Sequence, residues 1–318
     1  MYCVCGITAL EVYRAMGQRL PEILDRPRTS RLAGCSIPPR VHLSDDMARL
    51  GAGAGPYHLL LLDKRSCHRR PDIVCHTAPR IAATPRSLIR LEGGPLIVSP
   101  EQLLLDLAAQ RSYDDIDLLL IAFELCGTYV LDASWDGFTN VDRAATSRAR
   151  LMRYAERARG RRGAARAGRI ASLVIDGSHS PMETVMAMLF CLPHRLGGMG
   201  FQNGRLNERI KTADGTRWVD LAFPEGYGLE YQGRSYHSVE RTGRDAQRQH
   251  HLIGARMTTI NVWYQDLAEL HHFERLASDL AAAPGVRIRV RARNFTQRRA
   301  VLRARVLPSL NVSCLPDQ

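Results

Sequence analysis

Two short runs decide the fold of the C-terminal half: VDLAFP at Val219–Pro224 and GLEYQG at Gly228–Gly233. Each has the apolar character of a β-strand and carries one acid, Asp220 in the first run and Glu230 in the second. If the two strands pair, both carboxylates can reach one side of a sheet. A carboxylate in a buried strand needs a partner, and hard divalent cations prefer oxygen ligands. The pair therefore predicts a site for Mg²⁺ or Mn²⁺.

The neighbouring residues extend these strands into an α-β-β-β-α-β order. The sequence Ser180-Pro181-Met182-Glu183 is typical of a helix start and opens an apolar helix that runs to Leu192. We expect strands at 207–212, 217–223, 228–232 and 256–263, a polar helix at 239–254 and a closing helix from about Gln265. Trp263 and Tyr264 are expected as core aromatics, with stacking on an unpaired base as the alternative.

The two runs, with the residues that follow them, resemble the PD-(D/E)XK nuclease superfamily, and in particular its very-short-patch-repair-like, DUF559-type branch. The resemblance covers 180–267 and implies a restriction-endonuclease-like core that hydrolyses DNA phosphodiester bonds with Mg²⁺ or Mn²⁺. It also implies that Asp220 and Glu230 are metal ligands and that Glu183 is the helical carboxylate beside them. The further residues that carry the resemblance are His237, Asp245, Arg248, Leu252 and Gly254.

One position departs from the pattern of this superfamily. Its members usually have Lys two residues after the second acid, and this branch often has Asp, but here the residue is Gln232. A glutamine can orient a water or bond a phosphate oxygen, but it offers no titrating base. His237 can supply a base because its reference pKa of about 6.5 lies near neutral pH. The alternative function is therefore a catalytically inactive, nuclease-fold nucleic-acid-binding protein or antitoxin-like transcriptional regulator.

Several of these residues also have simpler structural explanations. Ser180 and Glu183 have the spacing of a capping box, in which the carboxylate bonds back to the Ser180 backbone N–H. His237 can be a surface histidine. Asp245 and Arg248 can be an ion pair on one helix face.

The charge of the chain favours a polyanionic partner, which we expect to be DNA. The 318 residues include 44 Lys and Arg against 32 Asp and Glu, a formal net charge of +12, and only Lys64 and Lys211 are lysines. Ten arginines lie in 143–169 and eight in 287–305. At 287–291 arginines alternate with apolar residues, which predicts an edge strand. The alternative is that these segments are simply solvated faces. The arginines expected to contact nucleic acid are Arg153, Arg157, Arg234, Arg248, Arg289 and Arg291.

We expect three parts: a smaller mixed α/β N-terminal domain at 1–142, a basic helical connector at 143–175 and the nuclease-like domain at 176–318 with its Arg-rich end. In the first part, Val98–Glu101 and Leu105–Ala108 are similar to the middle region of AbiEi-antitoxin-like regulators. That similarity implies a possible protein partner for the N-terminal domain.

The compartment is expected to be cytoplasmic. Eight cysteines are too few for a disulfide scaffold, so we expect reduced thiols. The start of the chain does not have the pattern of an export signal. The longest apolar run, 116–131, is broken by Asp117 and Glu124 and is too short to span a bilayer.

Overall fold

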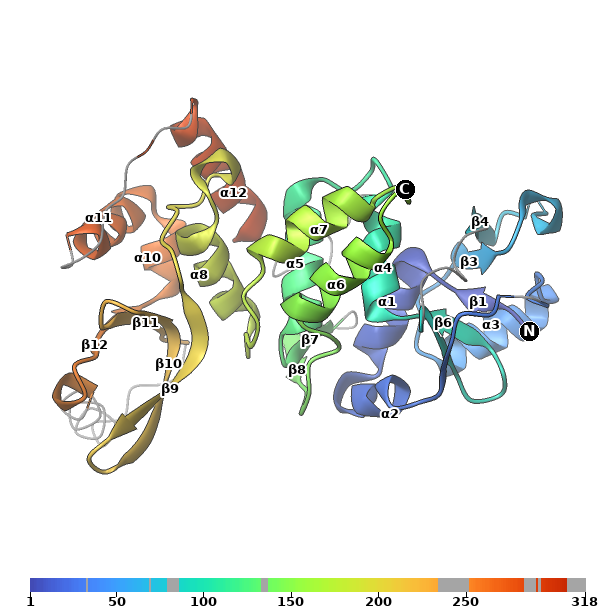
Figure 1. Ribbon diagram of the computed structural model, residues 1–318, viewed down its shortest axis with the longest axis horizontal. Helices are drawn as coiled ribbons and strands as arrows, with labels where there is room; N and C mark the ends of the chain where they lie inside the picture. The colour runs from blue at the N-terminus through green and yellow to red at the C-terminus, as the bar shows by residue number, and fades with distance from the viewer. Residues whose placement is uncertain are drawn as a thin grey trace. The chain divides into compact units, whose positions relative to one another are not determined.

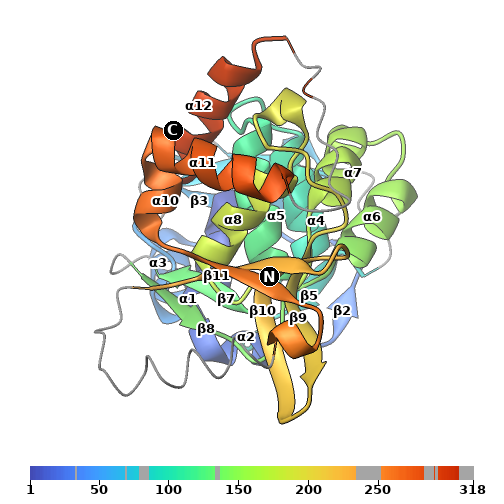
Figure 2. The same cartoon turned by 90° about the vertical axis from the view of Figure 1, so that its left-hand side faces the viewer.

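The computed structural model describes residues 1–32, 34–68, 70–78, 86–132, 137–233, 252–282, 290 and 293–307. The chain divides into two compact units, which contain Met1–Val174 and Ile175–Asn311 (Figures 1 and 2). Both units contain helices and strands, which confirms the predicted mixed α/β class. The N-terminal unit, expected to be the smaller, is the longer of the two.

A six-stranded mixed sheet organises the N-terminal unit, in the order β2-β5-β6-β1-β3-β4. β1 is central, parallel to β6 and antiparallel to β3. A separate hairpin pairs β7 with β8. The strands are β1 (Cys3–Val4), β2 (Arg28–Thr29), β3 (Tyr57–Leu61), β4 (Ile73–Thr77), β5 (Leu88–Arg90), β6 (Leu96–Val98), β7 (Tyr129–Asp132) and β8 (Gly137–Asn140).

Helices α4 to α7 pack against one another in the same unit (Figure 1). The basic stretch expected as a connector, 143–175, contributes α6 and α7 to this group. Gly163, just before α7, allows the chain to approach α4 closely. A Cβ at this position would lie 2.7 Å from the backbone of Leu105 in α4 and of Ala109 just after α4. The helices are α1 (Gly6–Ala15), α2 (Leu20–Leu24), α3 (Arg40–Arg49), α4 (Pro100–Ala108), α5 (Asp115–Cys126), α6 (Arg148–Arg157) and α7 (Ala164–Leu173).

A four-stranded sheet in the order β12-β11-β10-β9 forms the C-terminal unit. β9, β10 and β11 are successively antiparallel, and β12 joins parallel to β11. Such a parallel pair needs a crossover segment, here the residues between 231 and 258, whose described part is helical at 252–254. The elements are α8 (Pro181–Cys191), β9 (Arg205–Thr212), β10 (Gly215–Phe223), β11 (Tyr227–Tyr231), β12 (Thr258–Val262), α10 (Tyr264–Ala268), α11 (Leu270–Ala281) and α12 (Phe295–Val306).

Helix α8 packs against β10 and is buried along its whole length. Its apolar run explains this, because a helix that is hydrophobic on all sides needs cover on all sides. Phe190 of α8 contacts the rings of Phe201 and Phe273, so α8 and α11 share a core. A further buried cluster packs β10 against the segment that leads into β12. It consists of Val219, Ala222, Leu252 and Met257.

The predicted strands of the C-terminal unit agree with the observed ones to within a few residues. Helix α12 was not anticipated, because its arginines were assigned only to a basic surface. Within the described residues, no helix is long and apolar enough to cross a bilayer. The expected edge strand at 287–291 and most of the expected helix at 239–254 lie outside the described residues.

Candidate functional site

The two predicted acids lie on the central strands β10 and β11. Leu221 pairs with Leu229, and continuing this register by one residue brings Asp220 level with Glu230. Asp220 Oδ2 accepts a hydrogen bond of 2.7 Å from the backbone N–H of Tyr231, so this carboxylate reaches the end of β11. Glu230 is only 6% exposed. The two acids thus lie on adjacent, paired strands, one residue beyond the Leu221–Leu229 pair.

Helix α8 brings a third acid to this end of the sheet. Glu183 lies in the first turn of α8 and is 7% exposed. Its Oε1 accepts a hydrogen bond of 3.0 Å from the Ser180 hydroxyl, and its Oε2 accepts one of 2.7 Å from the His179 backbone N–H. The Ser180 hydroxyl in turn accepts from the Glu183 N–H at 3.2 Å. Glu183 therefore bonds to the start of the helix, but through the Ser180 hydroxyl and the His179 N–H and not through the Ser180 backbone N–H that a capping box predicts.

Asn207 is a residue of this site that sequence reasoning missed. Its Nδ2 donates to Glu183 Oε2 at 2.5 Å and to the Gly177 carbonyl at 2.9 Å. Asn207 has a left-handed backbone, with φ of 48°, at the point where the β9–β10 ladder skips from the Leu206 pair to the Glu208 pair. Asn tolerates this conformation better than most residues. The only signal in the sequence was an Asn where a strand was expected to begin.

Electrostatics place Glu183 close to Asp220. The pKa of Glu183 is raised from 4.5 to about 7, mainly by burial and also by the Asp220 charge, against three hydrogen bonds that favour the ionised form. The pKa of His179 is lowered by burial, with Asp220 opposing this change. Asp220 is therefore the charge that faces both Glu183 and His179. Near neutral pH this cluster binds a proton, and a cation can take the place of that proton.

These acids fit a Mg²⁺ ion that keeps several waters, since such sites commonly use one or two carboxylates. Asp220 and Glu230 would be its direct ligands. Glu183 would act through water, because both of its oxygens already accept hydrogen bonds from the protein. Among the residues that the structure describes, these three acids do not form a group whose ligand atoms all lie within 4.8 Å of one another.

Gln232, two residues after Glu230, is hydrogen-bonded to the neighbouring strand β12. Its Nε2 donates to Asn261 Oδ1 at 3.0 Å, and its backbone N–H donates to the Val262 carbonyl at 2.8 Å. The side-chain bond pairs the amide with a neutral group on β12. An amide held in this way can orient a water but cannot take up its proton. The other expected site residues of this unit, His237, Arg234, Arg248, Arg289 and Arg291, lie outside the described residues, as does Asp245.

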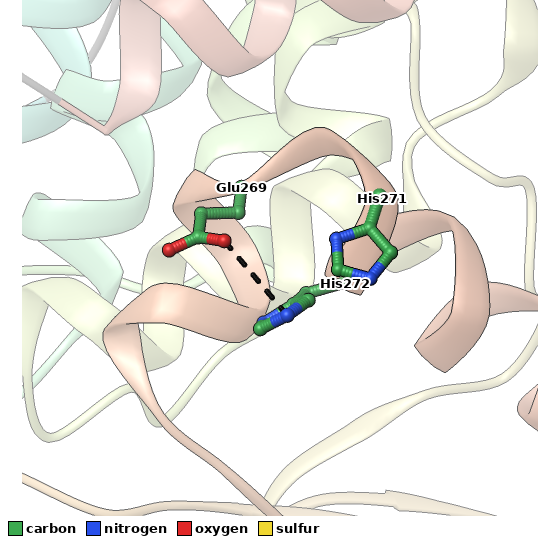
Figure 3. A group of neighbouring side chains, drawn as sticks. All are labelled: Glu269, His271 and His272. Atoms are coloured by element: carbon green, nitrogen blue, oxygen red, sulfur yellow. Dashed lines mark ion pairs between the residues drawn. The ribbon is translucent and has the colours of Figure 1, made fainter.

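A different group of side chains has the composition of a transition-metal site. One oxygen of Glu269 and one ring nitrogen each of His271 and His272 lie within 4.8 Å of one another (Figure 3). They come from the start of α11, and Glu269 and His271 are exposed. Imidazole nitrogen suits Zn²⁺ or Cu²⁺ better than Mg²⁺. Any metal titration of this protein therefore has to separate this group from the acids on β10 and β11.

Aromatic side chains near the end of the sheet are solvent-exposed. Trp263 is 43% exposed and Tyr264 is 41% exposed, directly after β12. The expectation that they are core residues was therefore wrong. Both follow a strand end, where the backbone leaves the packed sheet. Exposed rings of this kind offer stacking surfaces for unpaired bases.

Two of the arginines expected to contact nucleic acid, Arg153 and Arg157, belong to the N-terminal unit. They lie one turn apart on α6 and line a cavity of about 530 Å³. They make no ion pair with any residue that the structure describes. The structure thus gives these two arginines a concave setting, which an arginine-rich sequence segment does not reveal.

The chain matches no protein-family model, no curated protein and no solved structure. A function therefore has to be inferred from the site itself. Its firm elements are the three carboxylates Asp220, Glu230 and Glu183, the amide of Gln232 and the way the sheet brings them to one end.

Proposed function

We propose that the C-terminal unit is a Mg²⁺- or Mn²⁺-dependent nuclease that hydrolyses DNA phosphodiester bonds. The observation that carries this proposal is the arrangement of Asp220 and Glu230 level with each other on adjacent strands, with buried Glu183 facing Asp220. Three acids concentrated at one end of a sheet repel one another unless a proton or a cation is bound. A divalent cation both relieves that repulsion and serves phosphoryl transfer.

Each residue has a separate role in this proposal. Asp220 and Glu230 bind the metal, and Glu183 orients a water bound to it. The metal, when bound, lowers the pKa of a water and stabilises charge on the phosphoryl group. Gln232 orients the attacking water or a phosphate oxygen, and His237 accepts the proton. Exposed Trp263 offers a stacking surface beside this end of the sheet.

A second function is favoured by one specific observation, the hydrogen bond from Gln232 to Asn261. It pairs the amide with a protein group where related nucleases have a charged residue. The second candidate is therefore a nucleic-acid-binding or antitoxin-like regulator that has the nuclease fold without hydrolysis. Both candidates predict DNA binding that weakens with salt, because arginine contacts release counterions from the backbone.

Metal binding by the full chain is the first test. Mg²⁺ is titrated calorimetrically into the parent protein, into Asp220→Asn and into Asp279→Asn, which removes an exposed acid of the same unit. All three carry His271→Ala and His272→Ala, so that the group in Figure 3 does not contribute. We expect at least tenfold weaker binding in Asp220→Asn alone. Equal affinity in all three proteins would contradict a site at Asp220.

Cleavage of plasmid, linear and single-stranded DNA then separates the two functions. The nuclease predicts cleavage with Mg²⁺ or Mn²⁺ that EDTA, Asp220→Asn or Glu230→Gln abolishes and Asp279→Asn does not. The regulator predicts no cleavage and salt-sensitive binding that is the same in all variants. Gln232→Lys provides a further arm, because a lysine there restores the charge that the superfamily pattern contains. If metal binds and only Gln232→Lys cleaves DNA, the parent protein is the regulator.

A further inference from the structure

The N-terminal unit contains a cavity that is lined by six arginines. Its volume is about 530 Å³, within the usual range of small-molecule sites. It is bounded by α6, by the segment just before β5 and by the end of α2. All of its lining residues belong to the N-terminal unit, so it is separate from the acids of the C-terminal unit. The arginines are Arg28, Arg86, Arg143, Arg150, Arg153 and Arg157.

Half of these arginines are compensated by acids of the cavity wall. Arg28 Nη1 lies 3.2 Å from Glu101 Oε2, and Arg150 Nη2 lies 2.8 Å from Glu101 Oε1. Arg143 Nη2 contacts Asp25 Oδ1 at 2.7 Å. Glu101 is only 5% exposed and also accepts a 2.7 Å hydrogen bond from a threonine hydroxyl. This buried carboxylate is a rigid anchor that holds two guanidinium groups in position.

The other three arginines, Arg86, Arg153 and Arg157, make no ion pair with the residues that the structure describes. The cavity lining thus has a formal excess of four positive charges, six arginines against Asp25 and Glu101. Like charges around one concave surface repel one another, and an anion in the cavity would remove that repulsion. Arginine is well suited to phosphate because its planar group donates two parallel hydrogen bonds.

The cavity also has an apolar side. Leu24, Ala144, Ala145 and the ring of Tyr154 line it together with the arginines. Two polar contacts fix the Tyr154 hydroxyl. It donates a hydrogen bond of 2.6 Å to Gln102 Oε1 and lies 2.9 Å from Ser87 Oγ. A ligand that fills this cavity therefore needs several negative charges and can also place a flat apolar group against these residues.

We propose that this cavity binds a nucleoside polyphosphate, with the phosphates on Arg86, Arg153 and Arg157 and the base against the apolar side. A DNA duplex fits the cavity less well, since it presents its phosphates on a convex surface and keeps its bases stacked. The proposal is independent of the proposed nuclease, which uses the other unit. A small-molecule signal would then be read by the N-terminal unit.

The test is calorimetric titration of the full chain with ATP, pyrophosphate and adenosine, in EDTA so that no metal site contributes. The cavity variant is Arg153→Gln/Arg157→Gln. The matched control is Arg159→Gln/Arg169→Gln, which removes two charges from arginines of the same unit that do not line the cavity. We expect ATP to bind more tightly than pyrophosphate and adenosine not to bind. The cavity variant should lose at least tenfold in ATP affinity and the control less than threefold.

Three results would overturn the proposal: no ATP binding to the parent protein, an equal loss in both double variants, or ATP binding no tighter than pyrophosphate. A short DNA duplex serves as competitor. If the duplex displaces ATP and loses affinity only in the cavity variant, the cavity is a DNA-backbone surface instead. Both double variants are first checked for an unchanged urea midpoint, so that a loss of affinity is not a loss of folding.

Discussion

Replacing Glu183 with Gln should flatten part of the pH dependence of stability. The folded protein raises the pKa of this carboxyl from 4.5 to about 7, through burial and the Asp220 charge. The folded state therefore holds the proton more tightly than the unfolded chain. Its contribution to stability is complete below about pH 4.5 and is lost as the pH rises to about 7. Above that pH both states are ionised, and the folded state contains an unfavourable buried charge.

The size of this effect follows from the shift. A difference of about 2.5 units between folded and unfolded pKa corresponds to about 3 kcal/mol as an upper limit. Gln has nearly the shape of Glu, and its oxygen can still accept from His179 and Asn207 while its NH₂ meets the Ser180 hydroxyl. Relative to the parent protein, Glu183→Gln should thus gain up to about 3 kcal/mol in free energy of unfolding as the pH rises through this range.

Urea titrations at about pH 5, 6, 7 and 8, followed by circular dichroism, measure this difference. Glu225→Gln is the control, because it neutralises an exposed glutamate of the same unit and should leave the pH profile unchanged. Saturating Mg²⁺ should reduce the slope of the parent protein if the cation lies beside Asp220. Parallel pH profiles for the parent protein and Glu183→Gln would refute the argument that burial and Asp220 control this carboxyl.

Three further predictions concern the N-terminal unit. Gly163→Ala should lower the free energy of unfolding, measured in urea, by at least about 2 kcal/mol, because the φ of 86° disfavours a side chain and a Cβ would clash with backbone. Gly160→Ala should cost only about 1 kcal/mol, because Gly160 has a similar φ of 84° but open space around it. Arg14→Leu should cost about 3–5 kcal/mol because it leaves buried Glu124 unpaired, and in a double-mutant cycle the additional Glu124→Leu should recover part of this loss. Burial raises the pKa of Asp106 to about 7, so Asp106→Asn should remove the part of the decline in stability between about pH 4 and pH 7 that this carboxyl contributes beside Glu183, and an unchanged decline in urea titrations would contradict this.

Much of the C-terminal unit could be predicted because its signals are local. The apolar runs around Asp220 and Glu230 define two strands, and the short turn between them requires antiparallel pairing. The Ser180 cap likewise marks the start of α8, and its hydroxyl accepts the expected N–H bond. These features depend on neighbours within a few residues, so the sequence contains them directly.

The parts that could not be predicted depend on distant residues. Asn207 reaches Glu183 only because β9 lies beside β10, and neither residue indicates the other in the sequence. Trp263 was expected in the core because it follows an apolar strand, yet it lies where the chain leaves the sheet. The cavity arginines Arg28 and Arg150 are far apart in sequence and meet only through Glu101. Sequence reasoning found the charge in this region but not its concave arrangement.

The acids of the C-terminal unit link the two candidate functions through one equilibrium. A proton and a divalent cation both relieve the repulsion between Glu183 and Asp220, so they compete. Mg²⁺ should therefore bind more tightly at about pH 8 than at about pH 6, and binding should release a proton. This competition is the same for a nuclease and for a regulator that has lost hydrolysis, because it depends on the carboxylates and not on Gln232. The candidates differ only in what happens after the cation is bound, and that step depends on whether a water oriented by Gln232 can transfer its proton to another group.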